Sequence, residues 1–192
     1  MNAALIAVAV VLAIGVTVLF NRLVRLRNRF ENAFSQIDVQ LRRRHDLIPN
    51  LVETVRGYLA HERETLEAVI AARSGAVRAQ DAASPGDAAS MASLAGAEGM
   101  LSGALGRLMA VVETYPTLQA DAQVSGLREE LTSTENRVAF ARQAYNDAAT
   151  RFNTGAETFP GVVVARAFGF EPAALLEDRE PAIQQAPRVA LA

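Results

Sequence analysis

The sequence predicts an all-α protein, in which one N-terminal transmembrane helix is continuous with an antiparallel up-down-up-down four-helix bundle. A charge-free apolar run opens the chain, and apolar residues then recur every three or four positions. Alanine is abundant, tryptophan is absent and aromatic residues are few, which favours helices over strands. We expect an anchor over residues 1–21, the bundle over 22–171, and a flexible C-terminal tail over 172–192.

Composition excludes several classes of function. The chain of 192 residues has a formal net charge of −2, which argues against general nucleic-acid binding. It contains no cysteine, so disulfides, thiolate chemistry and cysteine-based zinc sites are excluded. All its basic side chains are arginines, whose forked guanidinium groups bind carboxylates or phosphates.

The apolar run over residues 3–20 has the length and composition of a membrane span. It holds no charge and a single polar side chain, Thr17, and roughly 17–25 apolar residues suffice to cross a bilayer. A cleaved signal peptide fits less well, because a basic start and a small-residue cleavage site are lacking. A buried soluble helix is the other alternative.

The charge around this run predicts its orientation. Arginines follow it and none precedes it, so we expect the N-terminus outside and the remaining chain in the cytoplasm of a bacterial inner membrane. The flanking residues are Arg22, Arg25, Arg27 and Arg29.

The first helix of the predicted bundle continues from the anchor, because no Gly or Pro separates the two. We expect it to end near His45, where Asp46 and Pro49 would open the next helix. A helix kinked at Pro49 is the alternative, since the apolar rhythm crosses this proline in phase. If the chain instead turns near His45, the second helix runs from Leu51 to about Val77.

A loop over residues 79–90 precedes a third helix over about 91–115, which Tyr115-Pro116 stops. The fourth helix has Thr117 or Asp121 as a candidate cap, and we expect it to end at Gly155. The apolar patch over 159–170 is too short to span a membrane. It would cover one end of the bundle, or contact another subunit or lipid.

Candidate chemistry is sparse. His45-Asp46 and His61-Glu62 are the only histidine sites, and they lack the Glu-x-x-His spacing of di-iron bundles, so we predict no metal, no cofactor and no catalytic residue. We expect helix-end and surface histidines instead. Polar residues line the first and fourth helices and would either fix helix register or form a recognition surface. They are Asn28, Glu31, Gln36, Asp38, Gln40, Glu135, Asn136, Arg137, Asn146 and Asp147.

Four glycines form a stripe on the third helix, nearly opposite its leucine face. Each glycine costs about 1 kcal/mol relative to alanine inside a helix, so the stripe calls for an explanation. Small residues let another helix approach closely, which makes the stripe a candidate contact in a homo-oligomer. The alternative is a weak helix in an Ala/Gly-rich chain. The glycines are Gly96, Gly99, Gly103 and Gly106.

The chain resembles the LemA family over nearly its whole length up to Phe170. The resemblance rests on the stretch from Arg27 to Glu53, which includes Glu31-Asn32-Ala33 and Arg44-His45-Asp46-Leu47-Ile48-Pro49, and on later motifs such as Glu113-Thr114-Tyr115-Pro116, Thr134-Glu135-Asn136-Arg137 and Phe168-Gly169-Phe170. It implies a membrane-anchored antiparallel helical bundle of bacterial type, with no established activity, substrate or cofactor. One branch of that family is associated with magnetosome membranes, which suggests membrane organisation.

We therefore expect a non-enzymatic scaffold, held in the lipid bilayer, that self-associates or docks other membrane proteins. No nucleic-acid partner and no small-molecule substrate are indicated. A lipid-binding or membrane-remodelling protein is the alternative, using the four flanking arginines and the 159–170 patch. An unknown enzyme is a third hypothesis, but the sequence contains no recognisable catalytic constellation.

Overall fold

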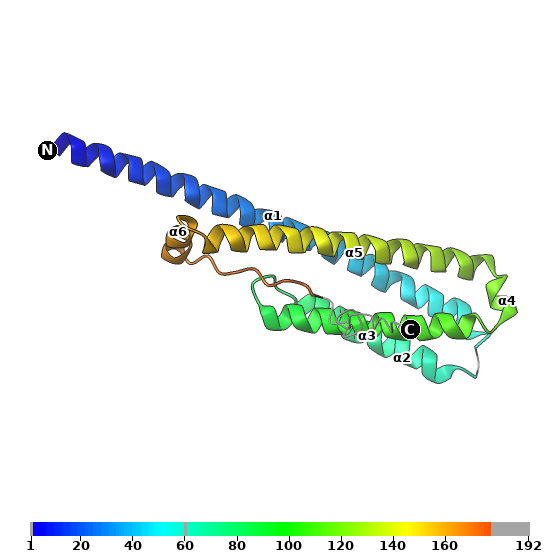
Figure 1. Ribbon diagram of the computed structural model, residues 1–192. Coiled ribbons are helices and arrows are strands. Elements are labelled where there is room, and N and C mark those ends of the chain that lie inside the picture. The colour runs from blue at the N-terminus through cyan, green and yellow to red at the C-terminus, as the bar shows by residue number, and fades with distance from the viewer. Residues whose placement is uncertain (1, 60, 178–192) are drawn as a thin grey trace, which may run out of the picture. The chain divides into compact units, whose positions relative to one another are not determined.

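A computed structural model describes residues 2–59 and 61–177 of the chain (Figure 1). Within these residues the regular secondary structure is entirely helical, which confirms the all-α prediction. The helices are α1 (Asn2–Arg56), α2 (Arg63–Ala82), α3 (Ala88–Val112), α4 (Pro116–Gln119), α5 (Ala122–Glu157) and α6 (Gly161–Phe168). They form two compact units, and α1 and α5 contribute residues to both.

Helix α1 combines the predicted span and the stem that follows it. Its most apolar 18-residue window has a mean hydropathy of 2.9, and none of that window is buried within the protein. By length and composition, α1 can therefore cross a membrane. The predicted end of this helix near His45 is wrong, because α1 continues through Pro49 to Arg56.

The chain leaves α1 at Gly57 rather than at Pro49. The N–H groups of Tyr58 and Leu59 both donate to the Val55 carbonyl at 3.0 Å, which closes the last turn before the connection to α2. The single second helix predicted from Leu51 to Val77 is thus wrong, since its first residues belong to α1. Glycine favours a helix end here, because fixing its backbone in a helix costs more conformational entropy than for any other residue.

The later boundaries agree more closely with the sequence. The loop predicted over 79–90 is shorter, because α2 extends to Ala82 and α3 begins at Ala88. Asp121 caps α5 as predicted: its Oδ1 accepts from the N–H groups of Gln123 and Val124, at 2.8 and 3.1 Å. The predicted end of α5 at Gly155 is wrong, since the helix continues to Glu157.

Gly155 has a packing role instead of a capping role. A Cβ on Gly161, the first residue of α6, would overlap the Gly155 carbonyl oxygen, and a Cβ on Gly155 would lie 3.1 Å from Cδ1 of Leu26. Gly161 therefore allows α6 to approach the backbone of α5, and Gly155 allows α5 to approach Leu26 of α1. Gly169 then ends α6 with a φ of 69°, a conformation that side-chain-bearing residues rarely adopt.

The first unit comprises Met1–Arg43, Ser84–Ala88 and Ser133–Leu175. Its core is the apolar stripe of α1 against the C-terminal part of α5. The rings of Phe30 and Phe152 lie 5.0 Å apart, and those of Phe34 and Tyr145 lie 5.7 Å apart. Phe152 and Tyr145 are fully buried.

The start of the predicted flexible tail is held against this unit. The side-chain amide of Asn153 exchanges two hydrogen bonds of 2.8 Å with the backbone of Ala173, and the Tyr145 hydroxyl donates to the Ala174 carbonyl. The N–H of Ala174 donates to the Pro85 carbonyl at 2.8 Å. The flexible tail therefore does not begin at Pro172, and residues 178–192 lie outside the described part of the chain.

The second unit comprises Arg44–Ala83 and Ala89–Thr132, together with the described residues from Leu176 to Glu177. The end of α1, α2, α3, α4 and the start of α5 all contribute buried apolar residues to one core. The leucine face of α3 is buried as predicted: Leu101 and Leu108 lie in this core, and Leu94 is also fully buried. The up-down-up-down order of the complete bundle stays a prediction.

Candidate functional site

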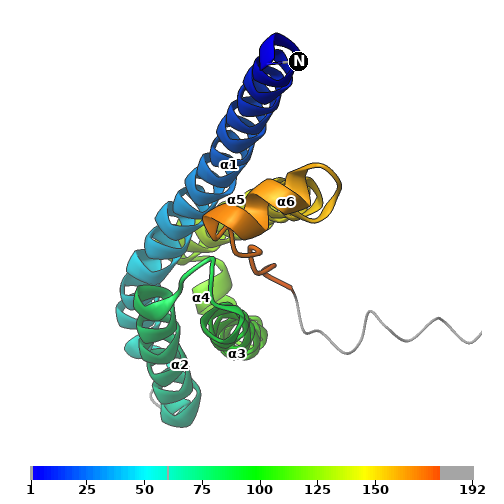
Figure 2. The same cartoon turned by 90° about the vertical axis from the view of Figure 1, so that its left-hand side faces the viewer.

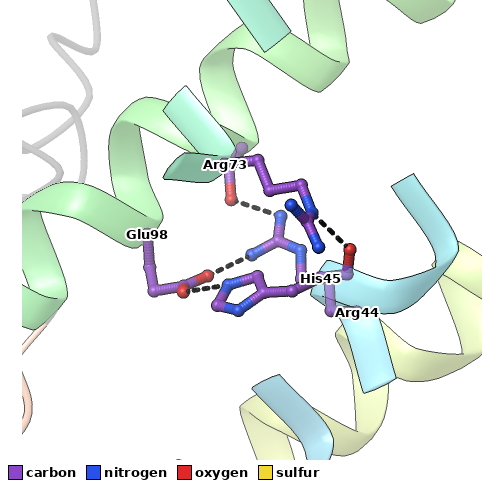
Figure 3. A network of polar contacts seen from close by, with 5 residues as sticks. Arg44, His45, Arg73 and Glu98 are labelled. Atoms are coloured by element: carbon purple, nitrogen blue, oxygen red, sulfur yellow. Dashed lines mark hydrogen bonds and ion pairs between the residues drawn. The ribbon is translucent and has the colours of Figure 1, made fainter. Parts of the chain in front are cut away.

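A buried cluster of charged side chains joins α1 to α3 in the second unit (Figure 3). Nη1 of Arg44 lies 2.9 Å from Oε2 of Glu98, and Nε2 of His45 lies 2.7 Å from Oε1 of the same carboxylate. Arg44 also donates through Nη2 to the Ser102 hydroxyl at 2.7 Å. The side chains of Arg44, His45 and Glu98 are only 5%, 3% and 14% exposed.

The local sequence explains why these charges are buried. Arg44 and His45 share the face of α1 that carries Ile48 and Val52, at helical spacing, so both side chains enter the core. Glu98 lies between Leu94 and Leu101 on the buried face of α3. Taking the charge of Arg44 or of Glu98 out of water is costly unless it is paired, so these two side chains depend on each other.

The side chain of Arg73, on α2, binds the backbone of the same part of α1 (Figure 3). Proline lacks an N–H, so Pro49 leaves the carbonyl of His45, four residues earlier, without its helical donor. Nε of Arg73 donates to that carbonyl at 2.6 Å. This bond explains why α1 continues through Pro49: a side chain from another helix satisfies the group that the proline leaves unpaired.

The cluster has the properties of a structural site. Nδ1 of His45 is buried without a hydrogen-bond partner, but the cluster contains two guanidinium groups and a single carboxylate, which disfavours a metal cation. In the described residues no group of three or more His, Cys, Asp or Glu side chains is arranged to hold a metal ion. We interpret the cluster as the element that fixes where α1, α2 and α3 meet.

The two predicted histidine sites differ from the expectation in one case. His45 is not at a helix end, because it lies within α1 and is buried against Glu98. His61 is exposed, as expected, in the connection between α1 and α2. Its neighbour Glu62 accepts a weak hydrogen bond from the Tyr115 hydroxyl at 3.5 Å.

The membrane-flanking arginines Arg22, Arg25, Arg27 and Arg29 all lie on α1 and are exposed. Arg27 lies 5.6 Å from the ring centroid of Phe170, a cation–π contact, and 3.7 Å from the Glu31 carboxylate.

The predicted patch 159–170 folds as α6 and contacts the end of the apolar span. The ring of Phe20 meets Phe168 at 5.0 Å and Phe170 at 5.6 Å, both edge-to-face. Leu23, Ala156, Val164 and Ala165 form a buried cluster beneath it. The patch thus contacts its own bundle with one face, while Phe159 and Val163 remain exposed.

The predicted glycine stripe lies on the outer face of α3. A Cβ added to Gly96, Gly99, Gly103 or Gly106 would meet nothing within 4 Å. Beside Gly103 runs a groove of about 730 Å³ between α2 and α3, floored by Ala68, Ala72 and Ala104 and flanked by Arg78 and Arg107. The four glycines therefore have no packing role inside the chain's own described structure.

Most of the predicted polar field on the first and fourth helices is exposed. Asn28, Glu31 and Gln36 on α1 are exposed, as are Glu135, Asn136, Arg137 and Asp147 on α5. Asp38, Gln40 and Asn146 are half-buried, and a role of the field in helix register stays a prediction. Among the described residues, the buried polar side chains are Arg44, His45, Gln80 and Thr134.

Three residues of the cluster were not predicted from the sequence: Glu98, Ser102 and Arg73. One signal for Glu98 was available, because it is the only charged residue between Asp87 and Arg107 and falls on the leucine face. An isolated carboxylate on an apolar helix face requires a buried partner. Arg73 had no comparable signal, since its acceptor is a backbone carbonyl 28 residues earlier in the chain.

Comparison with known proteins gives a consistent family assignment. Two relatives, Magnetosome protein MamQ 2 and MamQ 1 of Paramagnetospirillum magneticum, are each 29% identical over 177 residues, covering 83% of this chain and 65% of theirs. Magnetosome protein MamQ of Magnetospirillum gryphiswaldense is 29% identical over 169 residues, covering 79% of this chain and 62% of its own. The chain thus spans less than two thirds of the length of these relatives. The LemA family pattern matches residues 33–191, and the chain belongs to the LemA family.

Proposed function

We propose that this protein is a non-enzymatic scaffold, anchored in the bacterial plasma membrane by a single span and presenting its helices to partners on the cytoplasmic side. One observation carries the proposal: α1 joins an uncovered apolar span directly to a folded helical unit, without a break between them. Side chains of residues 2–18 are exposed, so an aqueous location would leave this apolar surface in water.

The family relationship supports a structural role. The MamQ relatives are named for a cellular structure, the magnetosome, rather than for a reaction. The buried side chains of Arg44, His45 and Glu98 bind one another across α1 and α3, as expected of groups that stabilise a fold.

The outer face of α3 supports self-association. Four exposed glycines and the adjoining alanine-floored groove form a surface of small residues, which allows close approach of another helix. We propose this face as the contact between copies or with another membrane protein. A monomer derives no packing benefit from these glycines, while each weakens α3 relative to alanine.

Cysteine labelling tests the anchor and its orientation. The natural chain has no cysteine, so Asn2→Cys and Gly86→Cys each introduce a single reactive thiol, the first at the start of α1 and the second in the exposed α2–α3 loop. In intact spheroplasts a membrane-impermeant maleimide should label only Asn2→Cys, and lysis should expose Gly86→Cys. The reverse pattern would contradict the orientation, and equal labelling of both in intact cells would contradict the anchor.

Crosslinking tests self-association. Gly103→Cys lies on the proposed contact, and Gly126→Cys on α5 is a matched control, because both glycines are exposed and both have open space around them. We expect a short bis-maleimide linker to join two copies of the Gly103→Cys protein in native membranes, and not the control. Monomeric behaviour of both variants would remove this face from the proposal.

A second candidate function is membrane remodelling, favoured by the exposed Phe159 and Val163 beside the apolar span. Wedge-like insertion of such residues into one leaflet bends a bilayer. Electron microscopy of vesicles carrying the full-length protein tests it. Tubulated or fragmented vesicles would support remodelling, whereas vesicles with unchanged size distribution would exclude it.

A further inference from the structure

We infer that α6 is an interfacial helix, which lies in the bilayer surface beside α1 and inserts its exposed apolar side chains into the lipid. The inference rests on the proposed anchor and extends it, because it assigns lipid as the partner of a second segment of the chain. Three independent features of the first unit support it: the level of α6, its direction and the chemistry of its outer face.

The contacts of α6 place it at the end of the span. The apolar run over residues 3–20 extends about 27 Å at about 1.5 Å per residue, nearly the roughly 30 Å thickness of a bilayer core. Helix α6 packs on Leu19 and Phe20, the last two residues of that run, and on Leu23, the first apolar residue beyond it. If α1 spans the membrane, α6 therefore lies where acyl chains meet lipid headgroups.

Helix α6 also lies in the direction that a surface helix requires. Figure 1 looks almost along the axis of α6 (orange), while α1 (blue) runs across the picture. In Figure 2 the same helix is seen from the side and lies crosswise to α1. A helix crosswise to a membrane-spanning helix runs roughly parallel to the bilayer surface.

The outer face of α6 is apolar where an aqueous surface would be polar. Phe159, just before the helix, is 83% exposed, and Val163 is 60% exposed. Phe168 adds a third large side chain that is more than half exposed, although its ring also touches Phe20. Exposed apolar residues gathered on one short element mark a contact surface.

The rest of the segment fits a lipid contact. Arg166 is exposed on the same helix, where its guanidinium can reach headgroup phosphates while its stem lies along the apolar face. Beyond Gly169 the chain turns away, and Phe170 lies against Phe20, Phe152 and Arg27. The contact between Gly155 and Gly161 holds the start of α6 against α5, so the position of α6 is fixed by the protein itself.

Lipid explains this surface better than a second copy of the chain does. A bilayer that surrounds α1 at Phe20 necessarily surrounds the neighbouring face of α6 with lipid, at no further cost of association. The four arginines that follow on α1 would supply attraction for anionic headgroups at the same surface.

Tryptophan fluorescence in vesicles of anionic lipid tests the inference, because the natural chain has no tryptophan. The full-length Val163→Trp protein is the test variant, and Leu12→Trp within the span is the positive control. The matched negative control is Phe140→Trp, since Phe140 is 72% exposed in the same unit. It lies about 24 Å before Ala156 along α5, at about 1.5 Å per residue.

We expect lipids brominated near the headgroup end of their acyl chains to reduce the Val163→Trp emission about twofold, as for an interfacial side chain. Lipids brominated near the middle of their acyl chains should quench Leu12→Trp more strongly than Val163→Trp. Neither kind of brominated lipid should quench Phe140→Trp. If Leu12→Trp is quenched and Val163→Trp is not, the anchor stands and the inference fails. If Leu12→Trp is not quenched either, the proposed anchor fails as well. Blue-shifted but unquenched Val163→Trp emission would overturn the inference in favour of a second copy.

Discussion

The hydrogen bond from Arg73 to the His45 carbonyl should be needed only because Pro49 is present. Replacing Arg73 by alanine leaves that carbonyl without a donor in a partly buried position. A charge-assisted bond of 2.6 Å belongs to the stronger class, and losing its donor costs roughly 1.5–3 kcal/mol. We therefore expect Arg73→Ala to lower the free energy of unfolding by about that amount.

A Pro49→Ala substitution should abolish most of this cost. The new N–H at position 49 can donate to the His45 carbonyl within α1, so the carbonyl no longer depends on Arg73. Proline inside a helix is about 3 kcal/mol less favourable than alanine, so Pro49→Ala alone should be neutral or stabilising. In the Pro49→Ala background we expect Arg73→Ala to cost less than about 1 kcal/mol.

A double-mutant cycle measures this dependence. The four full-length proteins would be unfolded with denaturant in detergent micelles and followed by far-ultraviolet circular dichroism. We expect an interaction free energy of about 1–2 kcal/mol between positions 49 and 73, above the roughly 0.3–0.5 kcal/mol of ordinary non-additivity. An equal cost of Arg73→Ala in both backgrounds would refute the account of how α1 passes Pro49.

Three further predictions follow from buried contacts. Glu98→Ala should cost about 3–5 kcal/mol of unfolding free energy, because it removes the carboxylate that pairs with the buried Arg44 guanidinium. Glu113→Ala, in an exposed pair, should cost less than about 1 kcal/mol, and similar losses in the two variants would argue against the cluster. Gly161→Ala should lower the free energy of unfolding by about 1–3 kcal/mol, because the added Cβ would overlap the backbone of α5. Gly126→Ala, in open space, should not lower it, and an equally stable Gly161→Ala protein would contradict the close approach of α6. Burial raises the pKa of Tyr145 from 10.0 to about 12, so an unfolded chain would lose this proton first and stability should fall as pH rises from 10 towards 12. The difference in phenolate absorbance between natural and Tyr145→Phe proteins checks this, and ionisation near pH 10 would disagree.

Local sequence patterns correctly predicted features that depend on neighbouring residues. The three-four spacing of leucines identified the buried face of α3, and Asp121 was one of the two candidate caps proposed for α5. Errors arose where a partner is distant in sequence. Pro49 was read as a helix boundary because its missing N–H is a local penalty, while its compensation comes from Arg73 on another helix.

Glycine was misread for the same reason. Gly155 resembles a helix end when only its conformational freedom is considered, yet it lies inside α5, where Leu26 of α1 occupies the space that a side chain would need. Gly57 was not predicted to end a helix, yet α1 ends immediately before it and the connection to α2 begins there.

The sequence alone determined that the chain is helical, that residues 3–20 form an apolar segment able to span a membrane, and that the chain is of LemA type, since composition, helical period and motif are properties of contiguous residues. Tertiary structure decided that α1 passes Pro49, that Glu98 joins Arg44 and His45, and that α6 meets Phe20. These outcomes depend on hydrogen bonds and contacts between residues far apart in sequence. A local preference such as that of Pro49 for a helix end can be overridden only once the helices pack. Packing brings a distant partner such as Arg73 within reach, and burial makes an unpaired polar group costly in free energy.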